Sequence, residues 1–267
     1  MPSVAEACRH VLETSEPRAK TMAVRRLARA WRAGRLEHRF DRAMPARPAR
    51  PPAPVLLAPS QMPKRGRAGS ERSRIAMLHA LAHIEFGAID LAVDMAGRFG
   101  ADFPAQFVDD WLGVAADEAM HFALLDQRLR SLGNFYGALP AHDGLWEAAE
   151  ATADDALARL AVVPMVLEAR GLDVTPSTVA AFEKGGDARS AAILRRIYQD
   201  EIRHVRAGAA WFEKGCKARG LAVVPHWQRL IRSRFRGALK PPFNDSARLE
   251  AGLSREMYAG VAQVGFA

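Results

Sequence analysis

The chain has 267 residues, of which 49% are hydrophobic and 25% are charged, a composition typical of a globular protein with one sizeable core. No stretch approaches the roughly 20 uninterrupted apolar residues of a membrane helix, and the N-terminus lacks the apolar segment of a secretory signal. We therefore expect a cytoplasmic protein with no membrane partner. The two cysteines, Cys8 and Cys216, exclude a disulfide framework and a cysteine-based zinc site.

The net charge of +8 is distributed unevenly along the chain. Residues 1–74 hold 17 Lys and Arg against 6 Asp and Glu, whereas residues 75–217 hold 13 against 21. The last segment, residues 218–267, is basic again. Basic arms that flank an acidic centre fit contact with nucleic acid. They also fit arms that fold back on the acidic centre, and we favour this interpretation because no recognition motif accompanies the charge.

The N-terminal arm, residues 1–44, is expected to be helical over about 3–35, because apolar residues recur there at helix spacing up to Gly34. Residues 45–69 form a Pro-rich linker. Seven prolines between residues 45 and 63 exclude an α-helix and predict an extended strap along the outside of the fold.

The central segment, residues 70–220, carries four strong helical patterns. They predict helices at about 71–98, 104–132, 152–170 and 187–219. Pro164 should loosen or kink the third helix one turn before Glu168, and a break with room for one short helix should follow between Asp173 and Gly186. Residues 134–150 have about the length needed to cross the end of a bundle.

We therefore expect an all-α fold, a ferritin-like four-helix bundle with N-terminal helices and the strap. The C-terminal tail, residues 221–267, is interrupted by Pro241 and Pro242 and is expected to pack on the bundle.

The pattern Glu-x-x-His occurs twice, and in each half a lone glutamate stands 33 residues before the glutamate of that pattern. Residues i and i+3 share a helix face, so the Glu and His of one pattern can reach the same metal. Four glutamates and two histidines arranged in this way form the ligand set of a di-iron carboxylate site in a four-helix bundle. The predicted ligands are Glu85, Glu118, His121, Glu168, Glu201 and His204.

Each iron would take one histidine and one terminal glutamate, and two glutamates would bridge the pair. The four negative carboxylates then balance two ferrous ions, whereas without metal some of them would have to take up protons. We expect two iron ions as the cofactor, as Fe/Fe or as the Mn/Fe alternative, because both pairs accept carboxylate and imidazole ligands.

Asp117 and Asp200 each precede the glutamate of one pattern. An aspartate at this position can accept the free N–H of a ligand histidine on the facing helix and so fix its tautomer. Arg203 could hold such a carboxylate. Solvent-facing positions are the alternative for all three residues.

Four other polar residues lie near the predicted ligands. His79 and His83 do not occupy the positions one turn away from Glu85, which favours packed or surface histidines over ligands. His142 is expected to form a hydrogen bond that stabilises its loop rather than to stand at a substrate entrance. Tyr198, one turn before Glu201, is interpreted as a core residue rather than a redox or proton partner.

Seven segments of the sequence carry a resemblance to a known family: residues 78–85, 109–112, 117–121, 139–146, 167–173, 200–205 and 241–244. Through them the sequence resembles a family of uncharacterised bacterial ferritin-like proteins known only as a domain of unknown function. The wider superfamily includes ferritins, rubrerythrins and the tRNA hydroxylase. The resemblance implies a ferritin-like fold and agrees with the six ligands, but it supplies no substrate. The chain lacks the Cys-x-x-Cys pairs of rubrerythrin, which argues against a full rubrerythrin mechanism.

The expected function is that of a non-haem di-iron oxidoreductase, an oxygenase (hydroxylase) or an oxidase, that activates O₂ and acts on an unknown small-molecule or RNA substrate. No catalytic residue is assigned beyond the metal ligands. Electrons would come from a separate electron-donor protein, because no flavin or nicotinamide signature occurs. The alternatives are an iron-handling or peroxide-detoxifying protein, and an RNA-associated hydroxylase that uses the basic arms. A homodimer is compatible with the sequence.

Overall fold

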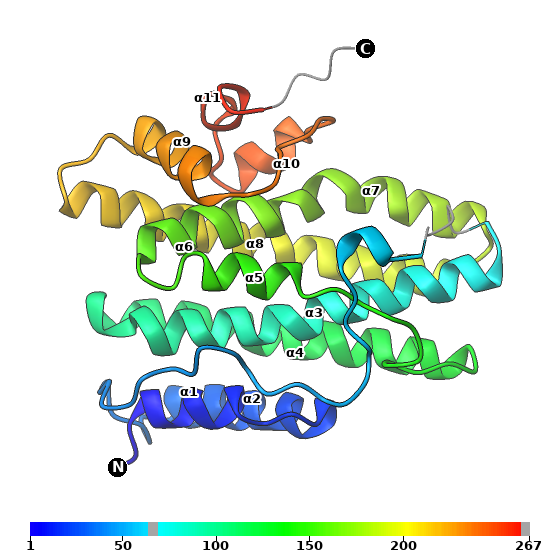
Figure 1. Ribbon diagram of the computed structural model, residues 1–267, viewed down its shortest axis with the longest axis horizontal. Helices are drawn as coiled ribbons and strands as arrows, with labels where there is room; N and C mark the ends of the chain where they lie inside the picture. The colour runs from blue at the N-terminus through cyan, green and yellow to red at the C-terminus, as the bar shows by residue number, and fades with distance from the viewer. Residues whose placement is uncertain (64–68, 263–267) are drawn as a thin grey trace.

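The computed structural model describes residues 1–63 and 69–262, and within these ranges the regular structure is helical apart from isolated β-bridges. The prediction of an all-α protein is therefore confirmed for this part of the chain. Four long helical rods lie side by side around the main apolar core (Figure 1). They are α3 (Glu71–Phe99), α4 (Ala105–Ser131), α8 (Ala188–Ala218) and a continuous rod of α6 (Ala156–Val162), π-helical η3 (Val163–Glu168) and α7 (Ala169–Lys184).

The connection between the second and third rods determines the topology. Helices α3 and α4 are antiparallel and are joined through the short η2 (Gly100–Asp102), whereas α4 and the α6–η3–α7 rod run in the same direction (Figure 1). Residues 132–155 therefore return along the length of the rods, and do not merely cross one end as the sequence suggested. The return is stabilised by α5 (Gly144–Glu150), because its Trp146 is buried against Leu91 and Val163.

The third rod departs from its prediction after Asp173. The expected break between Asp173 and Gly186 is wrong, because α7 continues to Lys184 with Pro176 inside it. A proline in a helix leaves the carbonyl four residues earlier without its usual donor. Here that carbonyl, on Leu172, accepts a hydrogen bond from Asn244 Nδ2 at 3.1 Å, so a tail residue compensates for the proline.

Pro164 lies in the wide π turn of η3, so the helix is loosened at this proline, one of the two expected outcomes. Its ring packs directly on α8 at Gly208, where a Cβ atom would lie 2.5 Å from the Pro164 ring carbons. The glycine thus allows α8 to approach η3 closely, and this contact places the π turn, with Glu168 at its end, against α8.

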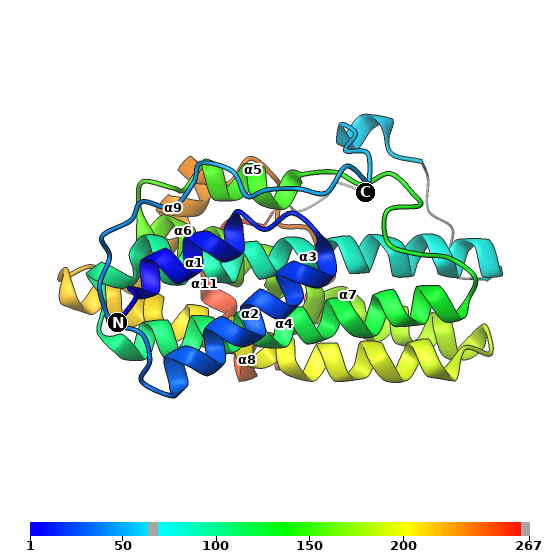
Figure 2. The ribbon, with the colours of Figure 1, turned by 90° about the horizontal axis from the view of Figure 1, so that it is seen from below.

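The N-terminal helices α1 (Val4–Leu12) and α2 (Pro17–Arg32) pack on α3 and α4 (Figure 2). Lys20 of α2 is fully buried, and its Nζ lies 2.5 Å from Asp90 Oδ1 of α3. The Pro-rich segment follows the outside of the core, where the backbone oxygens of Pro45 and Ala46 accept hydrogen bonds from Arg98 and Trp146; it contains the short η1 (Pro59–Gln61). The arm is thus folded onto the acidic centre, as the charge pattern favoured.

The C-terminal helices also pack on the rods. Helix α9 (Val223–Arg234) contacts α6 and α8, α10 (Asp245–Glu250) contacts α7 and α8, and α11 (Arg255–Ala259) contacts α9. Helix α3, with η2, is the one segment among the described residues that is long and apolar enough to cross a membrane, but 67% of its most apolar window is buried inside the protein. Its apolar composition is therefore explained by its place in the core.

Candidate metal centre

The four rods each bring at least one of the six predicted ligands toward a common centre. Glu85 lies on α3, Glu118 and His121 on α4, and Glu201 on α8. Ligand atoms of these four residues all lie within 4.8 Å of one another. We call the six predicted ligands together the Glu/His cluster.

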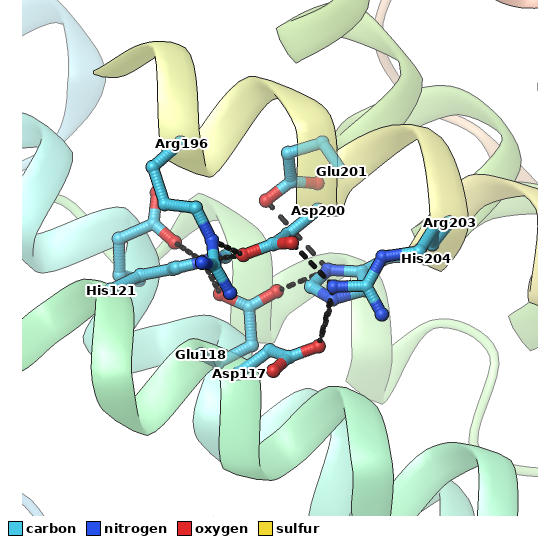
Figure 3. A network of polar contacts seen from close by, with 9 residues as sticks. Asp117, Glu118, His121, Arg196, Asp200, Glu201, Arg203 and His204 are labelled. Carbon is cyan, nitrogen blue, oxygen red and sulfur yellow. Dashed lines mark hydrogen bonds and ion pairs between the residues drawn. The ribbon is translucent and has the colours of Figure 1, made fainter. Parts of the chain in front are cut away.

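Glu118 occupies the middle of the cluster, between the two imidazoles (Figure 3). Its Oε2 lies 3.3 Å from His121 Nδ1, and its Oε1 lies 2.9 Å from His204 Nδ1. His121 Nδ1 is also 3.2 Å from Glu85 Oε2, and His204 Nδ1 is 3.9 Å from Glu201 Oε1. Both histidines therefore direct Nδ1 inward, toward the carboxylates.

Glu168 joins the cluster from the end of the π turn. Its carboxylate atom Oε2 is buried, and its charge interacts with those of Glu118 and His204. With Glu85 and Glu201 it also borders a cavity of about 180 Å³ that opens between α3, α7 and α8. The structure therefore places Glu168 beside the four tightly grouped residues, on the side that faces this cavity.

The outward nitrogens of the two histidines each meet a carboxylate on the facing helix. His121 Nε2 lies 3.1 Å from Asp200 Oδ2, and His204 Nε2 lies 3.3 Å from Asp117 Oδ2. An aspartate that accepts the Nε2 proton leaves the Nδ1 lone pair free to bind a metal. The expected contacts of both aspartates are thus present in the structure.

Arginines hold these aspartates from the solvent side (Figure 3). Arg203 pairs with Asp200 and, at 3.3 Å, with Asp117. Arg196 Nε donates to Asp200 Oδ2 at 2.7 Å, a contact that the sequence reasoning missed. Its only sequence signal is the spacing of four residues between Arg196 and Asp200, which places both on one helix face.

The charges of the cluster are unbalanced when only the protein is considered. Burial, with repulsion from Glu118, raises the pKa of Glu85 to about 8 and that of Glu168 to about 7, and the same causes raise the pKa of Glu201. Burial also opposes charge on Glu118, but the two imidazoles outweigh it and hold its pKa well below the usual range. Conversely, contacts with Glu118 and Glu85 outweigh burial and raise the pKa of His121 to about 12.

Several buried polar atoms of the cluster have no hydrogen-bond partner. Glu118 Oε1 and His204 Nδ1 lie 2.9 Å apart without the geometry of a hydrogen bond. Leaving a buried polar group unpaired costs about 1–3 kcal/mol, so their concentration at one point calls for a ligand. Carboxylate and imidazole atoms together suit divalent first-row metals, and the residues therefore could hold such ions. The unpaired atoms are Glu118 Oε1, Glu168 Oε2, Glu201 Oε2 and His204 Nδ1.

The other histidines considered from the sequence form hydrogen bonds away from the Glu/His cluster. His79 Nε2 accepts the N–H of Gly137 at 2.9 Å, and His83 Nε2 lies 3.1 Å from the backbone oxygen of His142. His142 itself accepts the N–H of Gly144 at 3.3 Å, the loop-stabilising contact that we expected. These residues fasten the returning connection to α3, and the pattern correctly separated them from the predicted ligands.

Comparison with known proteins assigns the chain to a family. The model of the family described as "Protein of unknown function (DUF455)" matches residues 13–259. The chain belongs to this family. It is also 43% identical over 211 residues to an uncharacterized protein of Haemophilus influenzae, an alignment that covers 77% of this chain and 73% of the relative. No solved structure matches the chain.

Proposed function

We propose that the chain is a ferritin-like di-iron protein that functions as an O₂-dependent oxidoreductase, an oxygenase (hydroxylase) or an oxidase. The position of Glu118 carries this proposal, because each of its oxygens faces the inward nitrogen of a different histidine. One carboxylate between two imidazoles suits a pair of metal ions. The single long connection between two parallel rods also fits the topology of ferritin-like bundles.

The six residues of the Glu/His cluster would hold two iron ions, with Mn/Fe as the alternative pair. When bound, the metal pair supplies the electron transfer and oxygen activation that no side chain of the cluster can perform. The protein would fix the ligand tautomers through Asp117 and Asp200. The two ions would neutralise the four carboxylates. The protein would keep bulk water out of a centre in which every ligand residue except Glu168 is at most 9% exposed.

The proposed reaction needs electrons from outside the chain. Insertion of one oxygen atom into a C–H bond consumes O₂, two electrons and two protons, and it yields an alcohol and water. We propose a separate one-electron carrier protein as the donor.

The test is the metal content of the full chain, measured by plasma mass spectrometry after growth in iron-rich medium. We expect about two irons per chain in the wild type and loss of both in the double variant Glu118→Ala/Glu201→Ala. Glu213→Ala, which removes an exposed glutamate of α8, is the matched control and should keep the metal. A folded wild-type protein without metal contradicts the proposal, and a metal-loaded protein is then assayed for O₂ consumption.

A second candidate, an RNA-associated hydroxylase, is favoured by the outer face of α2. Arg25, Arg29 and Arg32 are exposed on this face, one helical turn apart. Deleting the arm would remove helices that pack on α3 and α4, so the sharper test is the triple variant in which these arginines become glutamine. RNA binding at low salt that is lost in this variant supports the candidate, and absence of binding in the wild type ends it.

A further inference from the structure

The cavity beside the Glu/His cluster has a specific shape and chemistry, from which we infer that it binds an uncharged apolar molecule the size of a single aromatic ring. Its volume of about 180 Å³ is close to the roughly 150 Å³ of an apolar cavity known to accommodate benzene. The inference rests on the proposed function in one respect: it makes this molecule the substrate class of the metal centre.

The wall of the cavity is apolar on three sides. Helix α3 contributes Leu81 and Leu91, the third rod contributes Leu167, and α8 contributes Leu194 and Ile197. Burying apolar surface against these five side chains is worth about 25 cal/mol per Å². Thr175 and Thr178 of α7 also line the cavity, and the Thr178 hydroxyl already donates to the backbone oxygen of Val174 at 3.0 Å. The wall therefore favours a hydrocarbon body over a hydrogen-bonding one.

The mouth of the cavity is also apolar. Ile84 and Val174, both of which line it, are 39% and 37% exposed, although most large aliphatic side chains of the core helices are buried. They lie on α3 and α7, on the two sides of the opening. An apolar molecule would cover both side chains as it enters.

The charges around the cavity argue against an anion. Glu85, Glu168 and Glu201 line it at the cluster, and their carboxylates repel a negative group. The cation among the described lining residues, Arg170, is held by the C-terminal tail, because its Nη1 donates to the backbone oxygen of Lys240 at 2.8 Å. If two divalent ions neutralised the carboxylates, neither a cation nor an anion would find an unpaired charged side chain in the lining, because Arg170 is held by the tail. An uncharged molecule is the one that this lining accepts.

Gly171 of α7 offers a way to fill the cavity without disturbing its walls. It lines the cavity, and a Cβ atom built on it meets no atom within 4 Å. A leucine at this position would therefore fill part of the cavity volume that the ligand needs. Gly113 of α4 is the matched control, because it is also helical, is exposed, and has the same open surroundings away from the cavity.

The experiment is a calorimetric titration of the purified full chain with benzene and, separately, with benzoate. We expect saturable binding of benzene, at least tenfold weaker binding in Gly171→Leu, and unchanged binding in Gly113→Leu. Thr175→Leu, which fills the cavity from a second position, should weaken binding in the same way. Benzoate, which has the same ring and one negative charge, should bind at least tenfold more weakly than benzene. Circular dichroism verifies that each variant is folded.

Three results would overturn the inference: no benzene binding by the wild type, binding as tight as in the wild type by both cavity-filling variants, or benzoate binding as tight as that of benzene. Metal content is measured on the same samples. Iron without benzene binding refutes the cavity inference and leaves the metal centre standing, whereas benzene binding without iron supports the cavity and refutes the proposed function.

Discussion

Helix α3 carries two kinds of buried carboxylate within ten residues. Asp90 and Asp94 are both fully buried, and each is neutralised by cations of the chain itself. Asp90 pairs with Lys20 and Arg50, while Asp94 pairs with Arg98 and Arg159 at 2.8 and 2.5 Å. Glu85, on the same helix, instead lies beside Glu118, Glu201 and His121.

Buried carboxylates in this protein therefore have two kinds of surroundings, one with a cationic side chain as partner and one without. Where a carboxylate serves the structure, a lysine or arginine from another element supplies the opposite charge. In the Glu/His cluster four carboxylates share two imidazoles, and several of their atoms have no hydrogen-bond partner. A buried charge without a partner costs several kcal/mol, so the cluster is costly as structure and would be stabilised if cations occupied it.

The largest expected effect comes from breaking a structural pair. Asp94→Ala leaves Arg159, which is 1% exposed, without its carboxylate, and should lower the free energy of unfolding by about 3–5 kcal/mol. Asp102→Ala, at an exposed position of η2, is the control and should have little effect. Urea denaturation measures both. A change below 1 kcal/mol for Asp94→Ala would show that the pair is not the stabilising contact that its burial suggests.

A smaller effect is expected from the contact that places the π turn. Gly208→Ala would drive a Cβ atom into Pro164, and such overpacking costs about 1–3 kcal/mol. Because η3 carries Glu168, the variant should also bind less metal than wild type. Gly113→Ala, where the added methyl group meets nothing, should instead stabilise the protein by about 1 kcal/mol. Thermal unfolding and metal content, measured together, distinguish the two glycines.

The same chemical change, a carboxylate replaced by its amide, can be made in the Glu/His cluster and at the ion-paired Asp94. Glu168→Gln removes one of several mutually repelling carboxylates, so the metal-free protein should be within about 1 kcal/mol of wild type or more stable. Its metal content should nevertheless fall. Asp94→Asn, the parallel change at the carboxylate that pairs with Arg98 and Arg159, should destabilise the protein and leave metal content per folded chain unchanged. The opposite pattern would assign a structural role to Glu168.

The smallest effect concerns a histidine that has no carboxylate partner. Burial lowers the pKa of His79 to about 4, so its folded form favours the neutral ring. Because the unfolded chain takes up this proton near pH 6.5, the contribution of His79 to stability is full above that pH and is lost as the pH falls toward 4. The melting temperature should therefore fall less between pH 7 and pH 5 in His79→Gln than in wild type. Identical slopes would contradict this account.

The long helices and the candidate ligands were accessible from the sequence because both depend on local spacing. The repeated Glu-x-x-His pattern placed Glu118 with His121 and Glu201 with His204. The structure brings Glu118, His121 and Glu201 close to Glu85, and it places His204 against Glu118. The crossed contacts of Asp117 and Asp200 also followed from their positions before the two glutamates. A metal role for these residues stays a prediction.

What the sequence missed depends on contacts between distant segments. The continuation of α7 through Pro176 relies on Asn244, which bonds to the carbonyl of Leu172 across 72 residues of chain. The buried pair of Asp94 and Arg159 joins residues that are 65 positions apart in the sequence, so no local spacing predicts it. The cavity likewise appears only when three helices are assembled around Gly171.

The π turn between α6 and α7 has a consequence for chain length. A π turn holds one residue more than an α-helical turn, and each residue of an α-helix advances by about 100°. Deleting one residue other than Glu168 within Val163–Glu168 would therefore convert the wide turn to a regular one and leave the inward faces of α6 and α7 in phase. The same deletion inside the regular helix α7 would rotate the residues beyond it by about 100° against those before it. Within this rod, η3 is thus the place where the chain can lose a residue without turning the leucines of α6 out of the core.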